Sequence, residues 1–214
     1  MVRSASVEDP RTRAARTHFD RWSATYERDR ASRRLREIQT AALARLALVP
    51  DDVLLDIGCG TGAAVRDASP TVTRAVGFDL SPAIITRARE LAATLANVEF
   101  VEGDVSGSLP FADGEFTAVL CTTAFHHFAR PQETVAEIAR VLAPGGRSLI
   151  ADANRSHPAV FMLDPLLRMF QPSHVGFRRL AQLRSDLRRV GFAAITTSTI
   201  WGGSYAFVKA EKPD

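Results

Sequence analysis

The fold is decided by the stretch Leu54-Leu55-Asp56-Ile57-Gly58-Cys59-Gly60-Thr61-Gly62. The apolar run from Val53 to Ile57 predicts a short buried strand of a parallel sheet. Three glycines follow at alternate positions, and residues 63–66 can open a helix. A strand, a glycine-rich turn and a helix are typical of a nucleotide-binding loop, because glycine lacks a Cβ and lets a ligand lie against the main chain.

The spacing of these glycines distinguishes between classes of nucleotide-binding loop. The dinucleotide fingerprint is GxGxxG, whereas this loop reads Gly58-x-Gly60-x-Gly62, and no Lys-Ser/Thr pair follows as in a nucleoside triphosphate site. Asp56 precedes the first glycine, and an acid there suits a ligand with an ammonium group better than one with a pyrophosphate. A dinucleotide-binding dehydrogenase and a glycine-rich turn without a ligand are the alternatives.

Two further acids follow the next two predicted strands, at residues 74–78 and 98–101. Because the carboxyl ends of parallel strands share one edge of a sheet, these acids and the acid of the glycine loop are expected to lie along one edge. Asp79 can accept both hydroxyls of a ribose. Asp104 can accept an adenine amine while the next N–H, that of Val105, donates to a ring nitrogen. A helix-capping or surface role for Asp79 and a turn role for Asp104 are the alternatives.

The glycine loop resembles motif I of the class I S-adenosylmethionine-dependent methyltransferases. The string His18-Phe19-Asp20-x-Trp22-x-x-x-Tyr26 is similar to the segment before the domain in the ubiquinone/menaquinone-biosynthesis-like (methyltransferase type 11) group. The resemblance implies S-adenosylmethionine as cofactor and S-adenosylhomocysteine as product. It implies these cofactor-binding residues: Asp56, Gly58, Cys59, Gly60, Gly62, Asp79, Leu80, Asp104, Val105, Cys121 and Tyr26.

The resemblance also implies a role for several of these residues. Asp56 would take the methionine ammonium directly or through water, and Leu80 would line the adenine face. Gly58 and Gly60 would let the cofactor approach the backbone, and the main chain near Cys121 would face the methionine moiety.

The C-terminal segments 193–201 and 204–210, separated by two glycines, predict a β-hairpin. The resemblance implies that the last strand is antiparallel. The predicted fold class is therefore α/β, a doubly wound Rossmann-like sheet of seven strands, mostly parallel, with an antiparallel C-terminal β-hairpin and an N-terminal helical lid. No repeat or linker interrupts the chain, so we expect a single domain over residues 16–214 after a flexible basic tail over residues 1–15.

The lid is predicted over residues 16–50. Phe19, Trp22 and Tyr26 are spaced three and four apart and share one helical face. This face either closes over the cofactor or packs into the core. A second amphipathic helix is expected to end before Pro50.

The fourth predicted strand covers residues 116–121. The loop that follows it carries His126 and His127 at the same sheet edge as the acids. One of them faces the substrate as a base or a donor, or one packs inside and the other caps the next helix. Residues 152–176 are expected to form a substrate-side insertion. Its strongly apolar segment 161–170 walls an apolar substrate pocket, packs as an insertion or touches a membrane.

The composition indicates which class of protein this is. The 214 residues are 46% hydrophobic and 24% charged, which is ordinary for one globular domain. No apolar run is long enough for a transmembrane helix, and the N-terminus lacks the apolar core of a secretory signal. We therefore expect a cytoplasmic protein whose two cysteines are thiols, and no metal site. The arginine excess in residues 1–36 either attracts an acidic substrate, nucleic acid or a membrane surface, or is a solvated face with a loose tail.

The resemblance, taken with these features, implies a methyltransferase that acts on a small molecule, apolar or aromatic, by in-line methyl transfer. No nucleic-acid partner is expected, peripheral membrane contact is an open alternative, and the oligomeric state is not predicted. The alternative functions are a non-catalytic S-adenosylmethionine- or S-adenosylhomocysteine-binding protein and an RNA methyltransferase.

Overall fold

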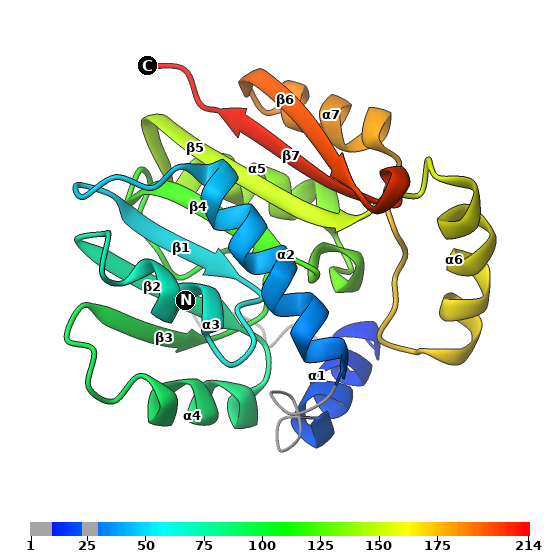
Figure 1. The fold of residues 1–214 in the computed structure, drawn as a ribbon, viewed down its shortest axis with the longest axis horizontal. Coiled ribbons are helices and arrows are strands. Elements are labelled where there is room, and N and C mark those ends of the chain that lie inside the picture. The colour runs from blue at the N-terminus through cyan, green and yellow to red at the C-terminus, as the bar shows by residue number, and fades with distance from the viewer. Residues whose placement is uncertain (1–9, 23–29) are drawn as a thin grey trace, which may run out of the picture.

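The structure, a computed structural model, describes residues 10–22 and 30–214. In this part of the chain a central sheet is flanked by helices on both faces (Figure 1). The strands are β1 (Val53–Ile57), β2 (Arg74–Asp79), β3 (Val98–Glu102), β4 (Phe116–Thr122), β5 (Leu142–Ala153), β6 (Ala193–Ile200) and β7 (Tyr205–Glu211). The helices are α1 (Pro10–Trp22), α2 (Arg30–Leu46), α3 (Ala63–Ala68), α4 (Pro82–Leu91), α5 (Pro131–Val141), α6 (Pro158–Phe170) and α7 (Leu180–Arg189), with short 3-10 turns η1 (Phe125–His127) and η2 (Trp201–Gly203).

The sheet has the order β3-β2-β1-β4-β5-β7-β6. Strands β3 to β5 run parallel, and β7 pairs antiparallel with both β5 and β6. The predicted fold class is confirmed, including the closing antiparallel hairpin. The strand order reverses between β1 and β4, and open α/β sheets bind their ligands outside the carboxyl ends of the strands at such a point.

Two hydrophobic clusters cover the two faces of the sheet. Leu54 packs with residues of α2, α3 and α4, whereas Leu55 and Ile57 pack on the face covered by α5 and α7. Because neighbouring residues of a strand point to opposite faces, a strand covered on both sides is apolar at most positions. This explains why β1 is apolar except at Asp56.

Helix α1 lies beyond the carboxyl ends of β1, β2 and β3 (Figure 1). The hydroxyl of Ser81, the N-cap of α4, donates to Asp20, and Arg16 lies 3.5 Å from Glu102. These contacts join the N-terminal helix to the sheet edge. The helix begins at Pro10, so residues 10–15, expected to be part of a flexible tail, are helical instead.

Strand β5 begins at Leu142 and includes the turn-forming residues 143–146. Helix α7 begins at Leu180. Among the described residues, no helix combines the length and the apolar character needed to cross a membrane.

Candidate functional site

The glycine turn after β1 is shaped by close backbone packing. Gly58 has a φ of +73°, and a Cβ there would lie 2.4 Å from the Cβ of Ala124. Gly62 has a φ of +77°, and a Cβ there would lie 2.4 Å from the ring of Phe100. Only glycine fits both constraints. Gly58 therefore keeps the turn against the loop after β4, and Gly62 seats the start of α3 against β3.

Asp56 is a buried carboxyl group without a protein partner. Its side chain is fully buried, and neither oxygen has a hydrogen-bond partner among the described residues. Burial, together with the nearby carboxylate of Asp79, raises the pKa of Asp56 to about 8. Buried polar groups are normally paired. The place beside Asp56 therefore suits a cationic or donor group from a ligand or a bridging water.

Asp79 ends β2 and holds the glycine loop. One carboxylate oxygen accepts the N–H of Gly60 at 2.9 Å, and the other accepts the N–H of Ser81 at 3.1 Å. Burial raises the pKa of Asp79, and these N–H donors oppose the increase. Asp104 accepts the N–H of Ser106 at 2.8 Å. Each carboxylate oxygen has further lone pairs, so both acids can accept hydrogen bonds from a ligand.

A pocket of about 70 Å³, here called the inner pocket, lies where these acids meet α1. Its lining from the sheet edge includes Gly58, Gly60, Asp79, Leu80, Asp104 and Val105. Thr12, Ala15 and Phe19 of α1 form its cover. Pockets for small-molecule ligands usually have about 300 Å³ or more. Helix α1 therefore holds much of this space closed.

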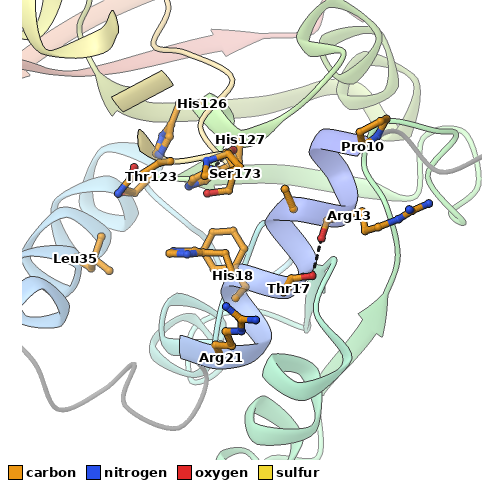
Figure 2. Close-up of a pocket in the computed structure, with 14 residues that line it drawn as sticks. Pro10, Arg13, Thr17, His18, Arg21, Leu35, Thr123, His126, His127 and Ser173 are labelled. Atoms are coloured by element: carbon orange, nitrogen blue, oxygen red, sulfur yellow. Dashed lines mark hydrogen bonds between the residues drawn. The ribbon is translucent and has the colours of Figure 1, made fainter. Parts of the chain in front are cut away.

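A second, more open pocket, the outer pocket, has a volume of about 930 Å³. Arg13, Thr17, His18 and Arg21 of α1 form one wall in Figure 2, and Thr123, His126, His127 and Ser173 stand opposite. Phe19, Thr123 and His127 line both pockets. These three residues therefore form the boundary between the two spaces.

His127 has a defined tautomer at this boundary. Its Nδ1 lies 2.7 Å from the carbonyl oxygen of Ser173, which can only accept, so Nδ1 carries the proton and Nε2 the lone pair. Burial lowers the pKa of His127 well below 6.5, and the neighbouring His126 lowers it further, while the bond to Ser173 opposes the shift. His127 is therefore a neutral imidazole at pH 7.

His126 is oriented by a carboxylate. Its Nδ1 lies 2.9 Å from both oxygens of Asp152, and its main-chain N–H donates to the same carboxylate at 2.9 Å. This arrangement places the His126 Nδ1 proton toward Asp152 and leaves Nε2 as the outer nitrogen. Both predicted histidines therefore lie in the outer pocket with fixed ring orientations.

Thr123 adopts a strained backbone conformation beside these histidines. Its φ is +54°, which is unusual for a β-branched residue. The Tyr205 hydroxyl donates to the Ala151 carbonyl at 2.9 Å, so the Thr123 hydroxyl donates to Tyr205 at 2.7 Å. Such strain is concentrated at functional sites. It marks the boundary of the two pockets as a constrained part of the fold.

Comparison with known proteins identifies the family. Residues 55–150 match the family described as methyltransferase domain. This part of the chain is a methyltransferase domain. The uncharacterized methyltransferase YcgJ of Bacillus subtilis is 36% identical over 126 residues, which cover 57% of this chain and 49% of that protein. The demethylmenaquinone methyltransferase of Tropheryma whipplei (strain Twist) is 32% identical over 130 residues, which cover 61% of this chain and 52% of that protein.

The chain spans about half the length of these two curated relatives. A solved chain from the complex of the Haloferax volcanii Trm112 methyltransferase activator with a methyltransferase has the same fold. It covers 98% of this chain and 100% of its own length, with a TM-score of 0.81 and 24% sequence identity. The family recognised in the sequence is confirmed, and with it S-adenosylmethionine as the cofactor of the family.

The residues of the methyltransferase domain fit this cofactor in their chemistry. The unpaired oxygens of Asp56 suit an ammonium group, and the acceptor oxygens of Asp79 suit ribose hydroxyls. Asp104 and Val105 border the same pocket and offer an acceptor and a main-chain donor to an adenine edge. No group of three histidine, cysteine or acidic residues that could hold a metal occurs in the described part of the chain.

The predicted cofactor-binding residues divide into two groups in the methyltransferase domain. Gly58, Gly60, Asp79, Leu80, Asp104 and Val105 line the inner pocket, whereas Asp56, Cys59, Gly62 and Cys121 are not part of its lining. Burial raises the pKa of both cysteine thiols well above the usual range, so they are inert core thiols. Tyr26 lies outside the described residues.

Several residues in or beside the two pockets were not predicted as site residues. Phe19 belonged to the recognised aromatic face, and Asp152 begins the expected insertion over residues 152–176, so a signal existed for both. Thr123 and Ser173 carry no such signal, because a positive φ and a carbonyl contact depend on the tertiary structure.

Proposed function

We propose that this chain is an enzyme that transfers a methyl group from S-adenosylmethionine to a hydroxyl-bearing small molecule, aromatic or otherwise apolar. His127 carries the proposal, because its neutral imidazole lines both the inner pocket and the outer pocket. A base at this boundary can reach a proton on an acceptor that lies next to the methyl donor. The outer pocket has the size expected for a small molecule.

The inner pocket takes the cofactor in this proposal. Asp56 accepts the ammonium directly or through water, Asp79 accepts the ribose hydroxyls, and Asp104 with Val105 holds the adenine edge. When bound, S-adenosylmethionine supplies a methyl group that is already activated by its sulfonium leaving group. The domain therefore has no leaving group to protonate, and its tasks are to align, to desolvate and to remove a proton.

His127 removes that proton in the proposal. Its Nε2 lone pair takes the proton of the acceptor hydroxyl, and the Ser173 carbonyl stabilises the opposite N–H as positive charge develops. His126, held by Asp152, orients the acceptor from the outer pocket. Alignment of reacting groups can contribute about 7–11 kcal/mol to such a reaction.

Helix α1 acts as the lid of the site in this proposal. The inner pocket of about 70 Å³ is too narrow for a nucleoside. Residues Thr12, Ala15 and Phe19 must therefore move outward when the cofactor enters and return to exclude water. The sequence predicts a lid over residues 16–50. In this proposal the lid is α1, which begins at Pro10.

Two measurements test the proposed function. Calorimetry should detect binding of S-adenosylmethionine and S-adenosylhomocysteine. With a panel of phenols and hydroquinones as acceptors, mass spectrometry should detect products about 14 Da heavier than the acceptor, because a methyl group replaces a hydrogen. No heat and no thermal shift with either nucleoside would count against the proposal at its first step. Binding without product from any acceptor would favour the non-catalytic binding protein, and product from RNA alone would favour the RNA methyltransferase.

A further inference from the structure

We propose that α6 and the arginines around it form a docking surface for anionic lipid membranes. Helix α6 turns its apolar side chains to the solvent and its carboxylate toward the protein. The exposed fractions of its large apolar side chains lie between 42% and 72%. These side chains are Phe161, Met162, Leu163, Leu166, Met169 and Phe170. Contiguous exposed apolar surface of this kind marks an interaction site.

Ion pairs hold the inward side of α6. Asp164 is fully buried, and one oxygen lies 2.9 Å from Nε2 of His174 and accepts the N–H of Phe177 at 2.9 Å. The other oxygen lies 2.9 Å from Arg155 and 3.2 Å from Arg168. Burial would raise the pKa of Asp164, but these partners hold it below the ordinary value. The charged network fixes the helix with its apolar side outward.

The outward side chains of α6 have no role in the two pockets. Neither the inner nor the outer pocket is lined by a residue of α6, and the lining of the outer pocket resumes only at Gln171. The exposure of the helix also excludes packing as a buried insertion. The sequence leaves three roles open for segment 161–170. An exposed apolar face supports one of them, contact with a membrane.

The charges around α6 complement an anionic surface. Residues 155–190 contain seven arginines and only two acids, Asp164 and Asp186. Both acids are buried, with exposed fractions of 0% and 6%. The charged side chains that this segment presents to solvent are therefore arginines. Two of them, Arg155 and Arg179, lie 5.3 Å and 5.8 Å from the ring centre of Phe161, so cations border the apolar face directly.

An exposed tryptophan lies in η2, next to the segment that enters α6. The amide of Asn154 donates to the carbonyl of Gly203 at 2.9 Å, which places η2 beside the segment that enters α6. Trp201 in η2 is 49% exposed. Indole rings favour the boundary between headgroups and acyl chains, because one end is polar and the rest is apolar.

A bilayer interface matches both the apolar face of α6 and the arginines around it better than the other candidate partners do. Apolar side chains enter the acyl boundary while guanidinium groups meet lipid phosphates. A symmetric dimer through α6 would bring the same arginines toward each other. RNA bases can stack on an aromatic ring, but RNA offers no continuous apolar phase for Met162 and Met169. Figure 1 shows α6 protruding at the margin of the molecule, beyond the end of β5, where a flat surface can reach it.

Docking through α6 would also bring the outer pocket to the lipid. Gln171, Pro172 and Ser173 follow α6 directly and line that pocket. An acceptor dissolved in the membrane would then enter from the lipid side. This consequence rests on the proposed function, whereas the docking itself does not.

Vesicle flotation of the full chain tests the docking without any methyl transfer. The chain should float with vesicles of phosphatidylcholine and phosphatidylglycerol, and much less with phosphatidylcholine alone or at high salt. The triple variant M162S/M169S/F170S should lose roughly tenfold or more in vesicle affinity. The control Val49→Ser, which removes a side chain that is 50% exposed elsewhere, should bind like the unaltered chain.

A second pair of variants separates charge from apolar contact. Arg179→Gln should weaken binding to anionic vesicles only, whereas Arg36→Gln, on α2, should not. Unchanged circular dichroism and S-adenosylhomocysteine affinity would show that the variants fold. Equal flotation of the triple variant and the Val49→Ser control would overturn the proposal. So would retention of RNA without vesicle binding, or a dimer that dissociates in the triple variant.

Discussion

The ring of Phe19 meets the ring of His127 edge-on, with 5.0 Å between the ring centres and an interplanar angle of 90°. Phe19 belongs to α1 and His127 to the loop after β4, so this contact joins the N-terminal helix to the sheet edge. Both residues line the inner and the outer pocket. The position of α1 and the environment of the proposed base are therefore linked through one pair of rings.

Replacement of Phe19 by alanine should weaken cofactor binding and slow methyl transfer. Aromatic pairs contribute about 0.5–1.5 kcal/mol beyond the area that they bury, so the dissociation constant for S-adenosylhomocysteine should rise up to about tenfold. Calorimetry in vesicle-free buffer measures this constant. The matched control is Phe170→Ala, since Phe170 is 72% exposed and lies outside both pockets. Equal affinities of the two variants would show that α1 does not cover the cofactor.

Replacement of His127 by glutamine should separate chemistry from binding. A positioned base typically contributes about 10²–10⁴-fold to a rate, so kcat should fall by about this factor while cofactor affinity changes little. Glutamine retains a polar side chain of similar reach without a basic nitrogen. Single-turnover rates and calorimetry on the same preparation give both quantities. A variant with full kcat would assign proton removal to another group or to the solvent.

The pH dependence of the reaction should reflect the lowered pKa of His127. The base must be neutral, and burial keeps its pKa well below 6.5. We therefore expect no loss of rate from protonation of His127 as the pH falls from about 8 to about 6.5, the range in which an unperturbed histidine begins to titrate. The profile should be recorded in the unaltered chain and in His127→Gln. A midpoint close to 6.5 in the unaltered chain that is absent from the variant would contradict the assignment.

Asp79→Asn should weaken the recognition of ribose rather than of adenine. The carboxylate accepts N–H donors of Gly60 and Ser81, and an asparagine oxygen can keep one of these bonds but offers weaker acceptance to hydroxyls. Hydrogen bonds to charged groups contribute about 1.5–3 kcal/mol, so adenosine affinity should fall about tenfold to hundredfold. Affinity for 2′,3′-dideoxyadenosine should change far less. The surface variant Asp67→Asn serves as control, and equal losses for both nucleosides would argue against ribose contact.

The chain order of the elements and the edge that holds the site could be predicted from the sequence, because both follow from local patterns. The run Val53–Ile57 is apolar at almost every position, as a doubly covered strand must be. Asp79 and Asp104 follow strands, and strand ends of a parallel sheet share one edge. These inferences need only periodicity and chain direction.

The depth of the site and the orientation of α6 could not be predicted in this way. Asp56 is fully buried and is not in the lining of the inner pocket, a difference that periodicity does not encode. In α6 the pattern shows many apolar residues and one acid, and a packed helix would bury the former. Asp164 instead contacts Arg155 before the helix, Arg168 within it and His174 after it, and these contacts determine which side faces inward.

Asp56 makes the stability of the ligand-free chain depend on pH. Its pKa is 3.8 ordinarily and about 8 in the folded chain, so between these values the folded state holds a proton that the unfolded state has released. Unfolding releases this proton, and the free energy of unfolding contributed by the group therefore decreases as the pH rises through that window, by at most about 1.4 kcal/mol per pH unit. Asp56→Asn should remove this slope in denaturant titrations, whereas the exposed Asp67→Asn should not.

The same proton reports on ligand binding. An ammonium group beside Asp56 favours the ionised carboxylate, so binding of S-adenosylhomocysteine near pH 7 should release a proton into the buffer. The measured heat should then vary with the ionisation enthalpy of the buffer, and this variation should vanish in Asp56→Asn. A heat that is independent of the buffer in the unaltered chain, with binding intact, would show that the ammonium does not meet Asp56 and would move the methionine end of the cofactor elsewhere along the sheet edge.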